Sequence, residues 1–312
     1  MVVGRAPSAN PVQADYIKRT NAALDYIVRN LDGELKLEDI ARVANFSPFH
    51  FHRVFRSLRG ETLNQFVKRQ RLERALNLMS HASGRSLTEI SLACGFSSSS
   101  DFSRSFKSRY GSAPSAFDLE HFRATKRQEF ADAMASHENG PDLGRLPAGQ
   151  NPDGFAVTMR DLPARTVAYI RVLDPYQSSA VVEACQRLLE WAEQRGLADG
   201  DWLGYMWEDP EIVALKDCRY DVAVVVDESQ FEFRPAGEVG RFEFPPMRVA
   251  DVSIRGDIQL EQRAIDWLFG TWLPRSGFVP DDQPAFAAWN GRPFEHGYEH
   301  FELSCQLPVK RA

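Results

Sequence analysis

The sequence predicts a protein of two domains, an all-α domain followed by an α+β domain. Three observations support this fold class. Residues 20–117 carry apolar side chains at helical spacing, and a stretch of about 30 residues occurs there twice. Residues 154–312 mix strand-like and helical patterns and contain a second duplication. The charge divides in the same way: residues 15–130 hold 19 Lys and Arg against 13 Asp and Glu, whereas residues 131–312 hold 17 against 30.

The composition is that of a globular protein. With 312 residues, 43% of them apolar and 26% charged, each half is long enough to bury its own core. The four cysteines form no CxxC pair, which argues against a disulfide framework and a structural zinc site. The first residues lack the apolar segment of a signal peptide, and no stretch approaches the roughly 18 apolar residues of a membrane span. We therefore expect a cytoplasmic protein with no membrane contact and no cofactor.

The all-α part begins with predicted helices over residues 20–31 and 36–45. A third helix follows, for which Ser47 is a suitable cap, Pro48 a suitable first residue and Gly60 a stop signal. This third helix has two chemically different faces. The face expected to point to the core carries apolar residues at i, i+3, i+4 and i+7, namely Phe51, Val54, Phe55 and Leu58. The opposite face carries Phe49, His52, Arg53 and Arg56.

An outward polar face on one helix is usually only a solvated surface, but here the arrangement is repeated. Residues 87–117 match residues 37–66 with an offset of 50, which becomes 51 at the start of the last helix, so Arg53 corresponds to Arg104. Each copy has a short helix, a tight turn and a second helix, which predicts two helix-turn-helix units in tandem. The turn residues are Asn45 and Gly95.

The outward face of the second copy carries hydroxyls and cations: Ser99, Ser100, Ser103, Arg104 and Lys107. Arginine can bridge two acceptors of guanine, serine and histidine can bond to base edges, and phenylalanine can cover a thymine methyl group. Residues 63–80 are predicted to form one connecting helix of about 27 Å, close to the roughly 34 Å between successive turns of the major groove. The pattern therefore favours DNA binding.

Residues 15–123 resemble the DNA-binding domain of the AraC/XylS family through the segments SPFHFHRVFRSLRGET and ACGFSSSSDFSRSFKSRYGSAPSAF. The resemblance implies double-stranded DNA as a partner and RNA polymerase as a further one. It implies base or methyl contacts from Phe49, His52, Arg53, Ser99, Ser100, Ser103 and Arg104. Because serine side chains are short, we expect the second unit to read sequence weakly and to hold mainly phosphates.

Residues 131–154 are rich in Gly, Pro and small residues and lack apolar periodicity, so we expect a linker between the two domains, at residues 124–153. After it, the strand-like segment 162–172 has an echo in 244–256, and each is followed by a helical pattern and two further strand-like segments. A β-α-β-β unit thus occurs twice. We expect an antiparallel α+β domain over 154–312, with a ligand cleft between its halves.

This second domain resembles the GyrI-like effector-binding domain, with WLPRSGF and the closing LPV as the most similar segments. The resemblance implies a small-molecule pocket lined by aromatic residues, with a buried glutamate on one strand. In this sequence Ala287 stands at the glutamate position and Trp289 at a tyrosine position, so flat neutral ligands are expected. A carboxylate elsewhere could replace the glutamate, and the candidates are Glu208, Glu299 and Glu302.

The aromatic residues predicted to contact the effector are Tyr169, Tyr205, Trp207, Phe286, Trp289, Tyr298 and Phe301. Tyr205 and Trp207 are the best candidates because alternation places them on one strand face. His296, His300 and Cys305 are not expected to bind a metal, since their spacing does not bring them together on a strand.

The sequence contains no GxSxG, HExxH or phosphate-binding loop, so no catalytic residue is assigned. The predicted function is a non-enzymatic, sequence-specific transcription regulator that responds to a small, aromatic or hydrophobic molecule. Two alternatives remain at this point. One is a hydrolase or sequestering protein for small electrophiles with an attached DNA-binding domain. The other is an interaction protein whose acidic half binds another protein.

Overall fold

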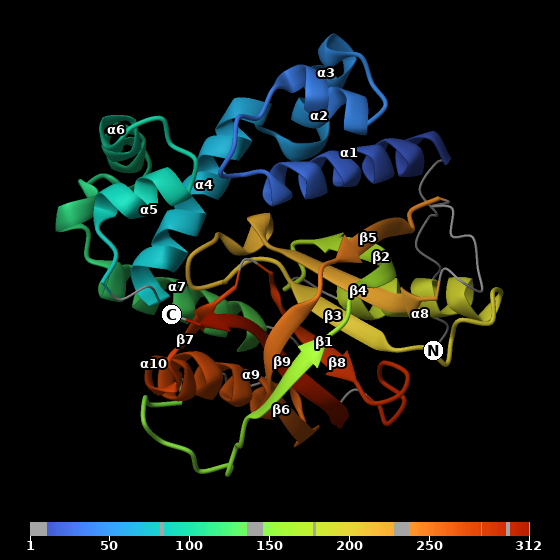
Figure 1. Cartoon of the computed structure of the whole chain (residues 1–312). Helices are drawn as coiled ribbons and strands as arrows, with labels where there is room; N and C mark the ends of the chain where they lie inside the picture. The colour runs from blue at the N-terminus through green and yellow to red at the C-terminus, as the bar shows by residue number, and fades with distance from the viewer. Residues whose placement is uncertain are drawn as a thin grey trace. The chain divides into compact units, whose positions relative to one another are not determined.

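The computed structural model describes residues 11–81, 84–135, 146–176, 179–227, 237–281, 283–297 and 300–311. They form two compact units, which are described separately (Figure 1). Helices α1 to α6 make up the first unit. Helix α7 and the strands and helices after it make up the second.

The first unit is all-α, as the sequence predicts. Its elements are α1 (Pro11–Arg29), α2 (Leu37–Val43), α3 (Pro48–Arg59), α4 (Leu63–His81), α5 (Leu87–Ala93), α6 (Ser99–Tyr110) and the 3-10 turn η1 (Pro114–Ala116). The Ser47 hydroxyl accepts a hydrogen bond from the backbone N–H of His50 and caps α3, which ends at Gly60 with a left-handed φ of 72°. Ser98 and Gly111 do the same for α6. The residue that shifts the repeat offset from 50 to 51 therefore lies just before α6.

Both helix-turn-helix turns use a left-handed residue, Asn45 with φ 53° and Gly95 with φ 80°. Gly95 is also in close contact with the loop after α1. A Cβ atom at this position would lie 2.5 Å from the carbonyl oxygen of Leu31 and 2.9 Å from that of Asp32. Only glycine fits there. This close contact holds the turn of the second helix-turn-helix against the loop after α1.

The predicted linker over residues 124–153 is wrong at both ends. Residues 124–135 belong to helix α7 (Leu119–Ala135), in which Arg127 and Phe130 are buried. Leu146 is 8% exposed and packs in the core of the second unit. The sequence misled because α7 is held by ion pairs, which leave no apolar periodicity. Residues 136–145 lie outside the described part of the chain.

The second unit is an α+β domain. Its strands are β1 (Thr158–Leu162), β2 (Arg165–Leu173), β3 (Trp202–Met206), β4 (Arg219–Val226), β5 (Gly240–Phe244), β6 (Met247–Gly256), β7 (Phe278–Pro280), β8 (Ala285–Trp289) and β9 (Phe301–Arg311). Its helices after α7 are α8 (Ala180–Glu193), α9 (Ile258–Trp267), the π-helical segment η3 (Leu268–Trp272), α10 (Leu273–Ser276) and the 3-10 turn η2 (Leu215–Asp217).

Within the described residues the strand order is β1-β6-β9-β8-β3-β4-β2-β5, with β7 added beside β9. The neighbouring strands from β1 to β2 in this order, and the pair of β7 and β9, are antiparallel. The predicted duplication is confirmed, but each half gains a further strand at its start. These strands, β1 and β5, pair with the opposite half, β1 with β6 and β5 with β2. The sequence hides β1 because this edge strand is exposed on both sides and lacks apolar alternation.

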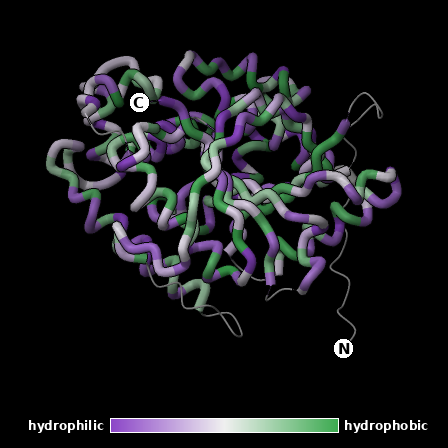
Figure 2. The backbone as a smooth tube through the Cα atoms, turned by 60° about the horizontal axis from the view of Figure 1, so that its bottom comes forward, coloured by the Kyte–Doolittle hydropathy of each residue, from purple (hydrophilic) through white to green (hydrophobic). Residues whose placement is uncertain are grey.

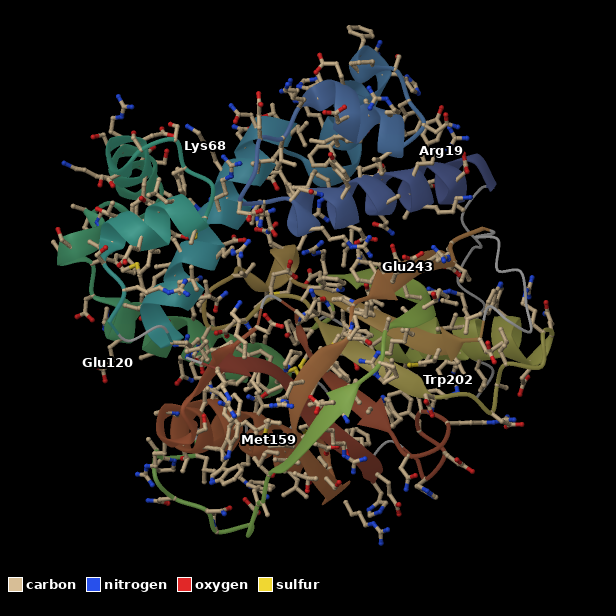
Figure 3. The ribbon with its side chains drawn as sticks, in the orientation of Figure 1. Arg19, Lys68, Glu120, Met159, Trp202 and Glu243 are labelled. Carbon is tan, nitrogen blue, oxygen red and sulfur yellow. The ribbon has the colours of Figure 1, made fainter. Side chains whose placement is uncertain are left out.

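The two faces of the sheet differ. Helix α8 packs on β2 and β4, and α9 packs on β6 and β9. We call the side that these helices cover the helix face. Its central strands carry Trp202, labelled in Figure 3, and the neighbouring Gly204 and Ala287, which pair directly across β3 and β8. The opposite side, the aromatic face, carries Tyr205 and Phe286.

Hydrophilic and hydrophobic stretches alternate along the backbone (Figure 2). Among the described residues, no helix combines the length and the apolar character that crossing a bilayer requires.

Candidate functional site

The first recognition helix, α3, separates its two faces as predicted. Phe51 and Phe55 are fully buried. On the other side Phe49 is 74% exposed, and the Arg53 guanidinium lies 5.8 Å from the centre of its ring. Arg53 and Arg56 are exposed, and His52 is partly buried. An exposed phenyl ring beside an exposed arginine is costly to keep in water, and it suits a surface that another molecule covers.

Aromatic contacts from α1 fix the start of α3. The ring of Tyr16 meets Phe46 edge-on at 5.4 Å, and its hydroxyl lies 3.3 Å from His50 Nε2. Arg19, labelled in Figure 3, donates a hydrogen bond to the carbonyl of Asn45 in the turn (3.3 Å). The orientation of the recognition helix is therefore set by packing before any ligand binds.

The second recognition helix, α6, presents an outward face with one exception. Ser100, Ser103, Arg104 and Lys107 are exposed. Ser99 is partly buried, and its hydroxyl donates to Thr88 Oγ1 (3.3 Å) and lies 3.5 Å from Ser91 Oγ. Ser99 thus joins α6 to α5. The sequence could not separate it from the other serines, because all four stand in one run.

The connecting helix α4 contains a buried polar network that the sequence did not reveal. Arg69 is 5% exposed and donates to Glu61 (2.6 Å) and to Glu73 (3.2 Å), while Gln70 also donates to Glu73 (2.9 Å). Arg71 on the same helix donates to the carbonyls of Leu31 (2.9 Å) and Gly33 (2.7 Å). The bonds to Leu31, Gly33 and Glu61 hold α4 to the loop after α1 and to the segment after α3.

The aromatic residues predicted for the effector pocket do not form one site. Tyr169, Tyr205, Trp207 and Phe286 lie on the aromatic face, where they pack with Phe242 and Phe244. Trp289 and Phe301 instead pack in the core between the sheet and α9, with ring centroids 5.3 Å apart. Tyr298 is outside the described residues. The register explains the split, because Phe286 and Trp289 stand an odd number of residues apart on β8.

On the aromatic face the ring surfaces are already covered by arginines of the protein. Asp221 accepts two bonds from Arg171 (2.8 and 2.6 Å) and one from the Trp207 indole N–H (2.7 Å). The Arg165 guanidinium lies 4.6 Å from the centre of the Phe286 ring. The cation–π positions are therefore taken by the protein's own cations.

The carboxylates expected to replace the family glutamate have other roles. Glu208 is bound by Arg219 through Nε (2.7 Å) and the backbone N–H (2.8 Å). Glu302 lies 3.6 Å from Arg255 and accepts from Asn290 (3.4 Å). Glu299 lies outside the described residues. Ala287 is 1% exposed and lies on the helix face, in the core cluster that includes residues of α9.

A carboxylate does lie on the helix face, at Glu261. This residue is 9% exposed and shares the buried stripe of α9 with Ala264 and Trp267. Burial raises the pKa of its carboxyl group to about 7. Burial also raises the pKa of Tyr220 and of the Cys305 thiol, and the charge of Glu261 adds to both increases. In the sequence, Glu261, Ala264 and Trp267 stand at i, i+3 and i+6, so a charged residue shares the helical stripe of two core residues.

Helix α7 is joined to both halves of the second unit. Arg127 donates to Glu211 (2.7 Å) in the first half and to both oxygens of Asp266 on α9 (2.9 and 2.6 Å). Arg123 also donates to Glu211 (2.5 Å). The ring of Phe130 on α7 meets Tyr176 at 4.9 Å. One helix thus contacts α9 and the segment before α8.

The described residues contain no group of three or more His, Cys, Asp or Glu side chains arranged to hold a metal ion. The rings of His296 and His300 lie 6.2 Å apart.

Comparison with known proteins agrees with the two units. Residues 40–120 match the model of a helix-turn-helix domain, and residues 155–310 match that of the GyrI-like small molecule binding domain. The chain is 31% identical over 114 residues to an uncharacterized HTH-type transcriptional regulator, YbfP, of Bacillus subtilis, an alignment covering 36% of this chain and 38% of that protein. It is 34% identical over 118 residues to the regulatory protein PocR of Salmonella typhimurium, covering 35% and 39%.

A third relative is the DNA gyrase inhibitor of Serratia proteamaculans, which is 28% identical over 166 residues that cover 50% of this chain and 99% of the inhibitor. The chain spans about two fifths of the length of the two regulators. The GyrI-like model, by contrast, matches half of the chain. The chain therefore belongs to the GyrI-like family, and an AraC-type helix-turn-helix domain precedes its GyrI-like domain.

Proposed function

We propose that the protein is a transcription regulator that binds double-stranded DNA through α3 and α6, and that a small molecule bound by the GyrI-like domain controls this binding. The observation that carries the proposal is the 74% exposed Phe49 beside Arg53, with a matching exposed face on α6. Two relatives are named as regulators, which supports the same function. In this proposal the protein acts in the cytoplasm, RNA polymerase is the partner that responds to the bound regulator, and no reaction is catalysed.

The two recognition helices have different tasks in this proposal. Arg53 on α3 reads a base edge, and Phe49 covers a thymine methyl group. On α6 the exposed hydroxyls of Ser100 and Ser103 are short, so Arg104 and Lys107 act mainly on phosphates. Ser99 is left out of the interface because its hydroxyl bonds within the unit.

The test is DNA binding by the full-length protein, measured by fluorescence anisotropy on fragments selected from a random pool. We expect Arg53→Ala to lose about 1–3 kcal/mol of binding free energy at one base position, and Lys107→Ala to weaken binding to all sequences and to lower the salt slope by roughly one. Equal binding of every sequence by Arg53→Ala and the parent would contradict the assignment of α3.

A further inference from the structure

Strand β6 has one edge that is only half covered. On one side it pairs with β9 over residues 249–256. On the other side it pairs with β1 over residues 247–251 only (Figure 1). Among the described residues, no strand therefore lies beside residues 252–256 on this second side. We call this part of β6 the open edge.

The hydrogen bonds of the neighbouring strands show which backbone groups point to the open edge. Asn290 donates its backbone N–H to the carbonyl of Glu302 (2.8 Å), so even-numbered residues of β9 bond toward β8 and odd-numbered ones toward β6. These odd-numbered residues pair with the even-numbered residues of β6. The backbone N–H and C=O groups of Ser253 and Arg255 therefore point to the open edge, and no described residue forms a hydrogen bond with them.

A cavity of about 390 Å³ lies against the open edge. Its lining includes residues 253–255 of β6, the segment 153–156 and Leu260 of α9. Ile254 and Phe155 in this lining are 4% and 9% exposed and belong to the core between the sheet and α9, so one wall of the cavity is apolar. An unpaired strand edge beside such a cavity can accept an extended peptide as a further strand.

One buried carboxylate in the lining has an oxygen without a donor. Asp251 is 2% exposed and lines the same cavity. Its Oδ2 lies 2.6 Å from Arg160 Nε and 3.1 Å from Gln306 Nε2. Its Oδ1 accepts a hydrogen bond from no described residue. A buried carboxylate oxygen without a donor destabilises the fold, and a basic side chain that enters the cavity would supply one.

We propose that the open edge of β6 binds an extended peptide segment of another protein, and that this segment carries an acidic, an apolar and a basic residue in succession. The segment adds to the sheet as a strand antiparallel to β6, as β1 and β9 do, and bonds to the outward backbone groups of Ser253 and Arg255. The proposal concerns the GyrI-like unit alone and is independent of DNA binding.

The register fixes the order of the three side chains, because paired residues of neighbouring strands point to the same face of the sheet. The basic residue stands opposite Ser253 and diagonal to Asp251, whose Oδ1 it reaches. The acidic residue stands two positions earlier in the antiparallel segment, opposite Arg255, whose side chain is 75% exposed. The residue between them points to the other face, where Ile254 and Leu260 are apolar.

The experiment measures binding of fluorescein-labelled peptides to the full-length protein by fluorescence anisotropy. One peptide is Ser-Gly-Thr-Glu-Val-Lys-Thr-Gly-Ser, and its control exchanges Glu and Lys. The two peptides have the same composition and net charge, so only the order of the charges differs. We expect the first peptide to bind at least about fivefold more tightly than the control, since two cross-strand charge pairs favour it.

Two proline variants test the backbone contacts. Ser253→Pro removes an N–H group that points to the open edge and keeps the bonds from β6 to β9, so it should weaken binding of the first peptide at least about tenfold. Met159→Pro is the matched control on β1, at a residue labelled in Figure 3. Thr158 pairs with Asp251 and bonds toward β6, so the N–H of the next residue points away from β6. Met159→Pro should therefore bind the peptide like the parent.

Asp251→Asn tests the side-chain contact without a change in the backbone, and it carries the test should Ser253→Pro fail to fold. It should weaken binding of the first peptide at least about threefold. Equal affinity of the parent for the two peptides would overturn the proposal, and so would no binding by the parent or full binding by both Ser253→Pro and Asp251→Asn. Self-association of the parent that Ser253→Pro abolishes, without peptide binding, would assign the open edge to a second copy and would also overturn it.

Discussion

At the scale of single residues, the surface side chains were easier to assign than the buried polar ones. The spacing of Phe51 and Phe55 predicted which side of α3 is buried, and it therefore also predicted that Phe49 and Arg53 are exposed. Ser99 could not be assigned in this way, because its hydrogen bond to Thr88 depends on how α5 and α6 pack. Glu261 was missed for the same reason, since its burial without a partner follows from tertiary structure alone.

The raised pKa of Glu261 makes a prediction about stability. Its pKa is about 7 in the folded state against 4.5 in the unfolded state. Burial of the neutral carboxyl group therefore stabilises the fold fully below pH 4.5, and this stability is lost as the pH rises through 7. The loss amounts to about 3 kcal/mol. We expect Glu261→Gln to be more stable than the parent at pH 8 and no more stable at pH 4.5, as measured by urea unfolding. A difference between variant and parent that stays constant over this range would refute the prediction.

At the scale of elements, capping and repeat signals predicted the helices well, while ion pairs and register escaped prediction. Ser47, Pro48 and Gly60 define α3 at the residues that the sequence indicated. Helix α7 was mistaken in part for a linker because Arg127 is buried by pairing with Asp266, a residue 139 positions away. Phe286 was correctly expected beside Tyr205 on one face of the sheet. Trp289 was wrongly placed with them, because successive side chains of β8 alternate between the two faces.

Gly95 tests how the two helix-turn-helix units are joined. Gly95→Ala places a methyl group 2.5 Å from the Leu31 carbonyl oxygen in addition to the left-handed strain, so it should destabilise the first unit more than Gly111→Ala does. Gly111 has φ 83° and open space around it, so its substitution should cost only the conformational strain of about 1–2 kcal/mol. Thermal unfolding compares the two variants directly. Equal losses of stability would show that the contact with Leu31 is unimportant.

Arg127 tests the attachment of α7 to the second unit. Arg127→Ala leaves the buried carboxylates of Glu211 and Asp266 without their shared partner, which should destabilise this unit by about 3–5 kcal/mol. Lys126 on the same helix pairs with the half-exposed Glu129, so Lys126→Ala should cost no more than about 1 kcal/mol. Urea unfolding of the two full-length variants provides the comparison, and similar midpoints would count against a structural role for the buried pair.

At the scale of the whole molecule, the chain order suggests how a signal is passed on. Helix α7 follows the second helix-turn-helix directly in the chain, and its side chains contact α9 through Asp266 and the segment before α8 through Tyr176. Glu261 lies on α9, less than two turns before Asp266.

We propose that one chain reads two neighbouring sites on DNA through α3 and α6. Sequencing of fragments selected from a random pool by the full-length protein tests it most directly. Helix α4, with 19 residues, spans about 28 Å between the two helix-turn-helix motifs, so we expect a DNA motif of two short elements about one helical turn apart. Arg53→Ala should weaken the base preference in the first element of the motif and leave the preference in the second unchanged. Selection of fragments without a shared motif, or of the same motif by the parent and by the double variant Arg53→Ala, Arg104→Ala, would contradict it.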